Sequence, residues 1–383
     1  MDKEVKYIGF YDFANNSNER VSALSGTNKM DYISEALIKA GFKVNIVSPS
    51  WGVDNIIDKN NLKSKDITID DNKSVTLFPT LKTGKGFFKP FKILYSLTYL
   101  FFWLLFNVKK NERILVYHSP SLSFPLLAAK ALKSFSIVLE VEEVYAEVWT
   151  EKKSFKKWEW RLINAADYYI CASDLLAQKL GVEKSFVVYG SYKLPEFTEF
   201  DFKNPGVNLV YAGSIDTVKG GVFKAIESMT YLNEDYYLQI CGYGSDQQVK
   251  SIVNLIKKTN HSLGREACIF HGKLLGDAFS NLLNSCDIAL NPQIEGDYMT
   301  TAFPSKILTY LSHNLHVLST NIESIKASVL APHINFTKND SPIEISLTIQ
   351  NIKIKEKNEN KQIINKLEVE LIENIQCIFN YHE

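Results

Sequence analysis

The sequence predicts an α/β protein built from two doubly wound domains. Short apolar runs alternate with segments of helical periodicity along almost the whole chain. This alternation is typical of largely parallel sheets that helices cover on both faces. The chain has 383 residues, which suits two domains of ordinary size, and the alternation is interrupted once, over residues 195–208. We therefore expect one domain over residues 1–200 and a second over residues 201–383.

The first domain is expected to begin with a strand at residues 5–13, followed by a polar loop and a helix at residues 27–40. Met30, Ile33 and Leu37 lie on one face of that helix. Gly41 follows it and is a typical helix stop. The other strands expected in this domain lie at residues 43–47, 75–78, 114–118, 137–141, 168–172 and 186–189.

The second domain repeats the pattern. Its strands are expected at residues 209–212, 236–241, 268–272, 287–291 and 316–319. Its helices are expected at residues 222–229, 246–258, 279–284 and 306–313. A last amphipathic helix is expected over residues 361–379, where it can pack on either domain. Doubly wound sheets bind ligands outside the carboxyl ends of their strands, so the site is expected in a cleft between the two domains.

Residues 87–108 form an aromatic run that can be interpreted in two ways. The uncharged part, residues 93–108, is shorter than the roughly 20 residues that cross a bilayer. One interpretation is a core helix of the first domain. The other is an element in the interface of an anionic membrane, with lysines near the phosphates and aromatic rings at headgroup depth. The flanking lysines are Lys82, Lys85, Lys89, Lys92, Lys109 and Lys110.

The composition is that of a globular protein. Apolar residues make up 45% and charged residues 22% of the chain. Lys+Arg and Asp+Glu are both 43, so the net charge is zero, which argues against a surface built for nucleic acid. The five cysteines have neither zinc-ligand nor redox spacing, and we expect them to be buried, reduced thiols. The charged N-terminal residues carry no secretory signal pattern, so a cytoplasmic location is expected.

Two glycine-containing turns follow predicted strands of the second domain. Gly213 and Ser214 follow the strand at residues 209–212, and Lys219 stands just before the next helix. A small residue at a strand end lets a ligand approach the backbone, and a lysine beside a helix N-terminus suits a diphosphate. Gly242 and Gly244 lie between the next strand and the helix after it. Each turn alone is a common feature of α/β proteins.

A third turn of interest starts at Phe303 and leads into a predicted helix. Pro304 suits a first helical turn, so backbone N–H groups near Ser305 and Lys306 are expected to point toward a ligand. Those amides, the serine hydroxyl and the lysine could together cradle a pyrophosphate.

The order and spacing of these turns resemble the retaining nucleotide-sugar glycosyltransferases of the GT-B fold, in the large family-four group. The matching segments are Ala-Gly-Ser at 212–214, Lys-Gly at 219–220, Gly-x-Gly at 242–244 and Phe-Pro-Ser-Lys-Ile at 303–307. The resemblance covers essentially the whole chain. It implies two Rossmann-like domains that face each other across a cleft, with a nucleotide-sugar donor on the second and an acceptor on the first.

The resemblance also implies roles for single residues. Lys219 and the turn at residues 304–306 would bind the donor phosphates, and Gly242 and Gly244 would lie beside the nucleotide base. In the first domain, Gly26 is the best match to the glycine of the loop before the first helix, which faces donor phosphate and acceptor.

The sequence departs from the family pattern around the third turn. The family often carries two glutamates eight positions apart there, the second of which binds the ribose hydroxyls. Thr301 and Thr309 occupy those positions. Glu295 lies upstream and is available for the ribose, although it is not aligned with either glutamate. The arginine that usually precedes the Lys-Gly pair is also missing.

Glu142 and Glu143 occupy the positions of a His-Asp pair that commonly ends this strand in the family. Three carboxylates within residues 140–143 are costly to bury at a strand end unless they are paired. They either form a solvated strand end or an ion pair, or Glu142 or Glu143 contacts acceptor hydroxyls or acts as a base. His118 ends another strand and is either a structural residue or part of the site.

These features favour a hexosyltransferase that uses a UDP-sugar and acts with retention on a saccharide or lipid-linked saccharide in surface polysaccharide biosynthesis. We expect no metal or cofactor, because no Asp-x-Asp pair ends a strand and no His or Cys cluster has ligand spacing. Two alternatives stay open. One is another GT-B nucleotide-sugar enzyme, such as an epimerase. The other is a non-catalytic relative that binds a partner or scaffolds an assembly.

Overall fold

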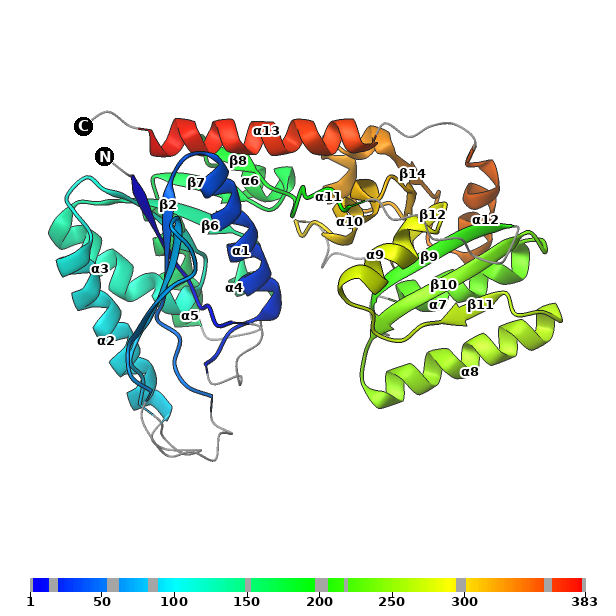
Figure 1. Ribbon diagram of the computed structural model, residues 1–383, viewed down its shortest axis with the longest axis horizontal. Coiled ribbons are helices and arrows are strands. Elements are labelled where there is room, and N and C mark those ends of the chain that lie inside the picture. The colour runs from blue at the N-terminus through cyan, green and yellow to red at the C-terminus, as the bar shows by residue number, and fades with distance from the viewer. Residues whose placement is uncertain are drawn as a thin grey trace. The chain divides into compact units, whose positions relative to one another are not determined.

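The computed structural model describes residues 3–13, 20–53, 62–81, 89–148, 153–196, 206–216, 220–293, 301–354 and 360–380 (Figure 1). The chain divides into two compact units, each built around one sheet. The first unit comprises Met1–Ala172, Leu176–Val188 and Val369–Glu383. The second comprises Ser173–Leu175 and Tyr189–Glu368. The predicted α/β class with two largely parallel sheets is confirmed.

In the described part of the first unit, eight strands form one sheet in the order β3-β4-β2-β1-β5-β6-β7-β8. Neighbouring strands are parallel except β3 and β4, which are antiparallel. The strands are β1 (Glu4–Ile8), β2 (Lys43–Ser48), β3 (Lys65–Thr68), β4 (Lys73–Leu77), β5 (Arg113–Tyr117), β6 (Ser136–Val141), β7 (Tyr168–Cys171) and β8 (Ser185–Val187). The sequence pattern misses β3 because its side chains are polar and mostly exposed, as an antiparallel edge strand permits.

The strand expected at residues 5–13 is too long, because β1 ends at Ile8. The amide of Gly9 still donates to Val47 O (3.1 Å), but the chain then leaves the sheet. The carboxylate of Asp12 accepts hydrogen bonds from the amides of Phe13 (3.0 Å) and Arg20 (3.2 Å). A carboxylate that takes over backbone donors in this way competes with strand pairing.

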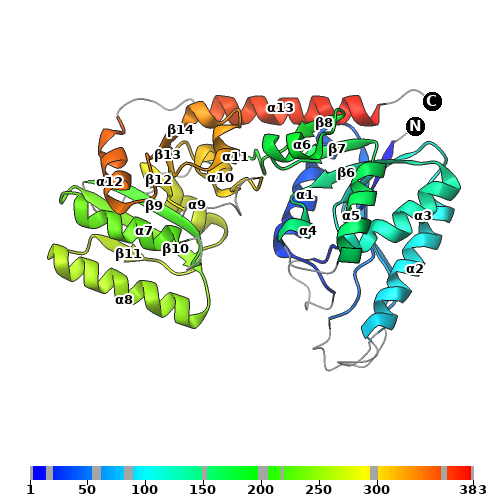
Figure 2. The ribbon, with the colours of Figure 1, turned by 180° about the vertical axis from the view of Figure 1, so that it is seen from behind.

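Helices cover both faces of the first sheet. The two opposite views show α1 (Leu24–Lys39) on one face and α2 (Lys89–Asn107), α3 (Ser123–Lys133) and α5 (Lys153–Ala165) on the other (Figure 1 and Figure 2). The second group packs in sequence, α2 on α3 and α3 on α5. The shorter helices of this unit are α4 (Tyr145–Val148), α6 (Asp174–Leu180), which begins in the second unit, and a 3-10 turn at Pro120–Leu122.

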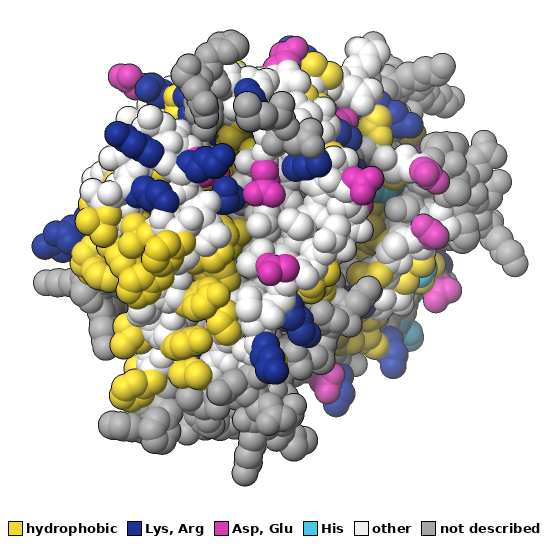
Figure 3. Space-filling model, turned by 60° about the vertical axis from the view of Figure 1, so that its left-hand side comes forward, with side chains coloured by type: hydrophobic (Ala, Val, Ile, Leu, Met, Phe, Trp, Pro, Cys, Tyr) yellow, Lys and Arg dark blue, Asp and Glu magenta, His cyan; other side chains and the backbone are white. Residues whose placement is uncertain are grey.

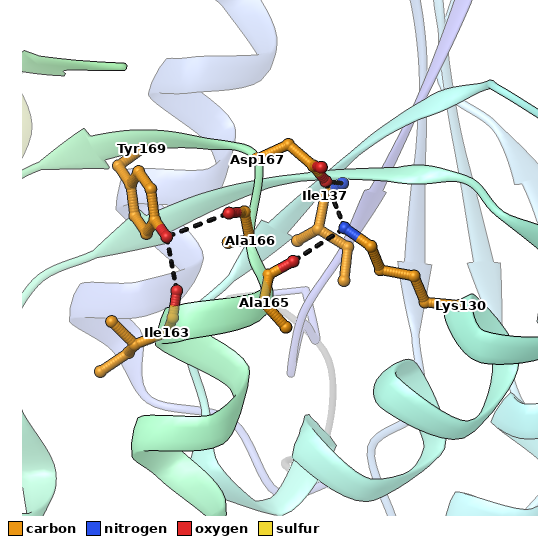
Figure 4. A network of polar contacts seen from close by, with 7 residues as sticks. All are labelled: Lys130, Ile137, Ile163, Ala165, Ala166, Asp167 and Tyr169. Carbon is orange, nitrogen blue, oxygen red and sulfur yellow. Dashed lines mark hydrogen bonds and ion pairs between the residues drawn. The ribbon is translucent and has the colours of Figure 1, made fainter. Parts of the chain in front are cut away.

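A polar network fixes α3 and α5 to the first sheet (Figure 4). Lys130 on α3 donates to Ala165 O at the end of α5 (2.7 Å) and pairs with the carboxylate of Asp167. Asp167 also accepts from the amide of Ile137 on β6 (2.7 Å). The hydroxyl of Tyr169 donates to Ile163 O (2.5 Å). One carboxylate thus joins a helix, a strand and the turn between α5 and β7.

In the described part of the second unit, six parallel strands form a sheet in the order β11-β10-β9-β12-β13-β14. The strands are β9 (Val207–Ser214), β10 (Tyr236–Tyr243), β11 (Cys268–Phe270), β12 (Ile288–Asn291), β13 (His316–Ser319) and β14 (Ile334–Phe336). The helices are α7 (Gly221–Ser228), α8 (Asp246–Leu263), α9 (Gly276–Asn284), α10 (Lys306–Ser312), α11 (Glu323–Lys326) and α12 (Pro342–Asn351). Among the described residues of this unit, 3-10 turns lie at Met229–Tyr231 and Ala331–His333.

Local sequence explains where α8 starts and stops. Ser245 and Gln248 form a reciprocal capping box: the serine hydroxyl accepts from the Gln248 amide (3.3 Å), and Gln248 accepts from the Ser245 amide (2.8 Å). Gly264 ends the helix in the left-handed conformation, with φ of 65°. The sequence pattern does not predict α12 or β14, which follow the last expected strand of the second domain.

The last helix, α13 (Asn360–Phe379), belongs to both units of the chain. Its first residue donates from the Asn360 side chain to Leu315 O (2.8 Å) in the second unit. Its last turns belong to the first unit, where Gln376 donates to Ala40 O (3.2 Å) and Phe379 packs against Phe42. Cys377 is exposed, which corrects the expectation that all five thiols are buried. Cys377 lies on the exposed side of α13, between the buried residues Ile375 and Ile378.

Candidate functional site

The carboxyl edge of the second sheet is lined by backbone where β9 and β10 end. Gly213 and Gly242 pair in register across these strands. A Cβ on Gly242 would lie 2.1 Å from Gly213 O, far inside van der Waals contact, and Gly213 has φ of 150°. Both positions therefore require glycine, and the edge stays open for a ligand to approach the backbone.

The side chain of Lys306 extends across this glycine edge. Its Nζ lies 3.1 Å from the place where a Cβ of Gly213 would stand, and 4.4 Å from the centroid of the Tyr211 ring. The ring is held because the Tyr211 hydroxyl donates to Ser214 O (3.1 Å). Burial raises the pKa of the nearby Cys241 thiol to about 11, and the ammonium of Lys306 opposes that rise. The edge thus carries a positive charge over an aromatic face.

Tyr310 positions Lys306, and the sequence reasoning missed it. It lies one helical turn after Lys306 on α10, and its side chain is fully buried. Its hydroxyl accepts from the amide of Ala212 (2.9 Å) and donates to the carbonyl of the same residue (3.1 Å). These bonds join α10 to β9 just before Gly213. In the sequence, Tyr310 is hidden among the apolar residues of a core-facing helix.

The turn that precedes α10 is anchored from two sides. Thr301 O accepts from the hydroxyl of Ser173 (2.5 Å), and Ala302 O accepts from that of Ser324 (2.7 Å). The ring of Phe303 packs on that of Tyr189, with centroids 4.7 Å apart.

The two residues after Phe303 differ in exposure. Pro304 is buried and its carbonyl accepts from Ile307 N (3.0 Å), whereas Ser305 is exposed at the start of α10 and its side chain caps nothing. The serine hydroxyl is therefore accessible from solvent.

Two predicted donor residues, Lys219 and Glu295, lie outside the described residues. Gly220, which follows Lys219, starts α7 in the left-handed conformation with φ of 61°. Gly221 lies against Tyr211, because a Cβ there would be 3.2 Å from Cε2 of the ring. The start of α7 therefore lies beside the ring on which Lys306 rests.

Gly244 and Thr309 have local structural contacts. A Cβ on Gly244 would stand 3.0 Å from Cβ of Ile215 and 3.1 Å from its carbonyl, so this position also needs a small residue. Thr309 is half-buried on α10, and its carbonyl accepts from Nδ1 of His313 (2.7 Å). Its short hydroxyl replaces the carboxylate that the resemblance predicts.

Gln293 is a further buried polar residue at the carboxyl edge. It follows β12, and its Nε2 donates to Oδ1 of Asn291 (3.0 Å). Its backbone carbonyl accepts from the hydroxyl of Thr320 (2.7 Å). Its Oε1 is buried without a hydrogen-bond partner among the described residues. The signal in the sequence is the pair of polar residues, Asn291 and Gln293, at the end of a buried apolar strand.

In the first unit, Glu142 follows β6 and pairs with a lysine that the sequence reasoning missed. Nζ of Lys29, on α1, lies 3.1 Å from Oε1 of Glu142 and donates to Val188 O (3.0 Å). The carboxylate of Glu142 keeps about a third of its surface exposed. Glu143 follows it and is half-buried. The end of β6 is therefore followed by an ion pair, Lys29–Glu142, that solvent can reach.

Glu140 is fully buried two residues before Glu142. The hydroxyl of Tyr7 donates to its Oε2. Burial raises the pKa of the Glu140 carboxyl to about 8, opposed by the positive charge of Lys29 and reinforced by the negative charge of Glu142. At neutral pH the protonated form of Glu140 therefore dominates.

His118 follows β5 and is almost completely buried. Burial lowers the pKa of its imidazole to about 4, so the ring is neutral at pH 7. Its Nε2 lies 3.5 Å from Oε1 of Glu159 on α5. Glu159 accepts from the amides of Tyr145 (2.8 Å) and Ala146 (2.7 Å), which fixes the start of α4 beside the imidazole.

Gly26 lies inside the first turn of α1, not in the loop before it, because α1 starts at Leu24. It is buried beside the Tyr117 ring, and a Cβ there would make an ordinary 3.5 Å contact. Gly9 is the position that cannot carry a side chain. A Cβ there would stand 2.7 Å from Sδ of Met30 and 2.9 Å from Cβ of Tyr117. The sequence reasoning missed Gly9 because it placed this residue within a strand.

Each unit thus gathers part of the predicted residues. The second brings Gly213, Gly242 and Lys306 together, and the first places His118 and Glu142 at the ends of neighbouring strands. Within the described residues, no three His, Cys, Asp or Glu side chains are placed to hold a metal ion.

Solved structures share this two-sheet architecture, although no family model and no curated protein sequence matches the chain. A structure from E. coli, described as trehalose-6-phosphate bound with UDP-2-fluoro glucose, matches with a TM-score of 0.66 at 10% identity over 98% of both chains. A UDP-forming alpha,alpha-trehalose-phosphate synthase from Burkholderia xenovorans matches with a TM-score of 0.65 at 8% identity, over 99% of this chain and 98% of that one. A glycosyltransferase from Rickettsia africae ESF-5 matches with a TM-score of 0.61 at 12% identity, over 98% and 94%.

The chain therefore has the fold of these solved structures, the GT-B fold that the resemblance implies.

The pairing of Gly213 with Gly242 predicts a severe effect of Gly242→Ala. The added methyl group would overlap a backbone oxygen, so the strand ends must separate, and we expect a loss of about 3 kcal/mol in the free energy of unfolding. Chemical denaturation measures it. Gly26→Ala is the matched control, since its new Cβ makes only ordinary contacts and its stability should not fall. Equal stability of both variants would contradict the packing at the glycine edge.

The raised pKa of Glu140 predicts a pH-dependent stability. The folded chain holds the proton up to about pH 8, whereas the ordinary pKa is 4.5. The stabilisation is therefore complete below pH 4.5 and is lost as the pH rises through 8. We expect the free energy of unfolding of the wild type, relative to Glu140→Gln, to fall across this window. A constant difference would show that Glu140 titrates alike in the folded and unfolded chains.

Proposed function

We propose that the protein is a hexosyltransferase that takes a sugar from a nucleoside diphosphate sugar, specifically a UDP-sugar, with retention. Its acceptor is a saccharide or lipid-linked saccharide in surface polysaccharide biosynthesis. The enzyme works on the cytoplasmic side of the membrane, as a peripheral protein. The observation that carries the proposal is the ammonium of Lys306 above the side-chain-free edge formed by Gly213 and Gly242.

The glycine edge has the chemistry that a leaving diphosphate needs. Negative charge develops on the nucleoside diphosphate as the bond to the sugar breaks, and a fixed positive charge stabilises that charge in the transition state. Lys306 supplies it, with Ser305 at the exposed start of α10 as a hydroxyl donor. Lys219 joins them as a second cation in the proposed site. Gly242 and Gly244 leave room for the base.

The choice of UDP rests on the similar structures. The E. coli structure contains UDP-2-fluoro glucose, and the Burkholderia xenovorans synthase is described as UDP-forming. With Thr309 in the position of the ribose-binding glutamate, the ribose hydroxyls need another acceptor. The buried Oε1 of Gln293, together with Glu295, is proposed for that role.

The acceptor is proposed to bind at the carboxyl ends of β5 and β6. Glu142, held by Lys29 and still partly exposed, accepts hydrogen bonds from acceptor hydroxyls, and Glu143 lies beside it. The neutral imidazole of His118, with Nε2 3.5 Å from Oε1 of Glu159, lies at the end of the neighbouring strand.

A nucleotide screen followed by a turnover assay tests the proposed activity. We expect UDP to raise the melting temperature more than GDP, ADP or CDP does, because ligand binding to the folded state stabilises it. A panel of UDP-hexoses with saccharide and lipid-linked acceptors should then yield a product that keeps the anomeric configuration. Release of free epimerised sugar without acceptor product would support an epimerase instead. If no nucleotide stabilises the protein and no donor turns over, the transferase proposal fails.

Lys306→Ala should weaken UDP binding about 10- to 100-fold, because a charge-assisted contact to a phosphate contributes about 1.5–3 kcal/mol. Lys219→Ala should act in the same direction. Isothermal titration with UDP measures both. Lys258→Ala, an exposed lysine on α8, is the matched control and should bind like the wild type. If Lys306→Ala and Lys219→Ala both bound UDP as tightly as the wild type, the proposal that these lysines bind the donor phosphates would be wrong.

A further inference from the structure

Helix α2 carries two apolar faces, and only one of them is used by the core. Leu100, Leu104 and Val108 are fully buried against the first sheet. The opposite side carries large apolar residues at positions 91, 94, 95, 102 and 106, whose separations of three, four and seven residues place them on one stripe of the helix. Their exposed fractions are 55% for Phe91, 62% for Leu94, 38% for Tyr95, 51% for Phe102 and 81% for Phe106. We call these five residues the outer face of α2.

The outer face is part of a wider apolar surface. A groove of about 380 Å³ runs between Tyr95, Phe102 and Phe106. The neighbouring helix α3 adds Phe124 and Leu132, which are also exposed, and Phe124 packs edge-on against Trp158 of α5. Hydrophobic side chains gather on this side of the molecule in Figure 3, with Lys and Arg side chains beside them. Monomeric soluble proteins rarely expose a continuous patch of this kind without a partner.

The charges of these helices select the kind of partner. The whole chain is neutral, but α2, α3 and α5 contain a single carboxylate, that of Glu159, which is buried. Five exposed cations lie on or directly after these helices, and we call them the basic rim: Lys109 and Lys110 follow α2, and Lys156, Lys157 and Arg161 lie on α5. The guanidinium of Arg161 lies over the Trp158 ring, 4.6 Å from its centroid. Two copies of this surface would repel each other, whereas an anionic surface is attracted.

Membrane-spanning is not the role of α2. Among the described residues, no helix is long and apolar enough to cross a bilayer. A helix with one face in a protein core and the other facing outward can instead lie in the plane of the membrane. Phe and Tyr side chains then enter the boundary of headgroups and acyl chains, while Lys and Arg contact lipid phosphates.

We infer that the outer face of α2, with its basic rim, docks on the surface of an anionic lipid bilayer. This goes beyond the proposed sugar transfer by assigning the membrane contact to named residues and to anionic headgroups. It does not need the transferase activity, and its test contains no donor or acceptor. Failure of docking and failure of the proposed function are therefore seen in different assays.

Vesicle flotation tests the apolar part. The full chain should float with phosphatidylglycerol vesicles, and the variant Phe91→Ser/Leu94→Ser/Phe102→Ser/Phe106→Ser should bind at least about tenfold more weakly. Phe101 and Trp103 are left intact, because they pack against the core. The matched control, Leu275→Ser/Val329→Ser/Ile343→Ser/Leu347→Ser, removes equally exposed apolar residues of the second unit and should float like the wild type. The melting temperatures show that both variants fold.

The charge part has its own comparison. Lys109→Glu/Lys110→Glu/Lys156→Glu/Lys157→Glu should lose binding to phosphatidylglycerol, and the wild type should bind phosphatidylcholine more weakly, with a difference that salt reduces. Equal binding to both lipids would overturn the selection of an anionic surface. No flotation of the wild type on phosphatidylglycerol would overturn docking itself. Docking would also be overturned if sedimentation equilibrium showed that the wild type is a dimer and the serine variant a monomer. A second copy of the chain would then cover the outer face of α2.

Discussion

The close approach of β9 and β10 at Gly213 and Gly242 is the constraint on which the candidate donor site depends. A side chain on Gly242 would overlap the carbonyl of the other strand, so the edge is made of bare backbone. Because Gly213 has no side chain, the side chain of Lys306 can extend across it, and its ammonium lies over the ring of Tyr211. The hydrogen bonds of Tyr310 to Ala212 hold α10 against β9, in the position from which Lys306 reaches the ring of Tyr211. The two glycines, the lysine and the two tyrosines therefore depend on one another here.

Most of the fold could be predicted from the sequence because most parallel strands are apolar runs and most helices have a 3.6-residue period. The failures occur where those signals are absent. β3 is a polar edge strand, and beyond Gly9 backbone amides bond to side chains instead of a neighbouring strand: Tyr11 N donates to Ser48 Oγ, and Phe13 N to Asp12. α12 and β14 lie after the last strand that the pattern supports. Tertiary contacts determine where a strand ends and which strand lies at a sheet edge, and sequence periodicity carries no information about those contacts.

The candidate site was less predictable, and the reason differs by residue. Glycines and lysines at turns are visible in a sequence, which is why Gly213, Gly242 and Lys306 were expected to lie near one another. Lys29 and Glu159 are not visible, because they sit within helices and meet Glu142 and His118 only through the fold. Gly26 was expected in a loop because the helix start was placed three residues too late, and Gly9 was missed because it was placed within a strand. Lys219 and Glu295 lie outside the described residues, so their roles stay predictions.

The chain has no net charge, but its charged side chains are distributed unevenly over the first unit, which the composition does not show. In the first unit, α2, α3 and α5 are basic and apolar on their outer sides, while the carboxylates of Glu142 and Glu143 directly follow β6. Asp167 links Lys130 of α3 to the amide of Ile137 at the start of β6 (Figure 4). Leu104 of α2 and Val141 of β6 also belong to one hydrophobic core. For the proposed lipid-linked acceptor, the outer face of α2 and the carboxylate of Glu142 would therefore act from the same unit of the chain.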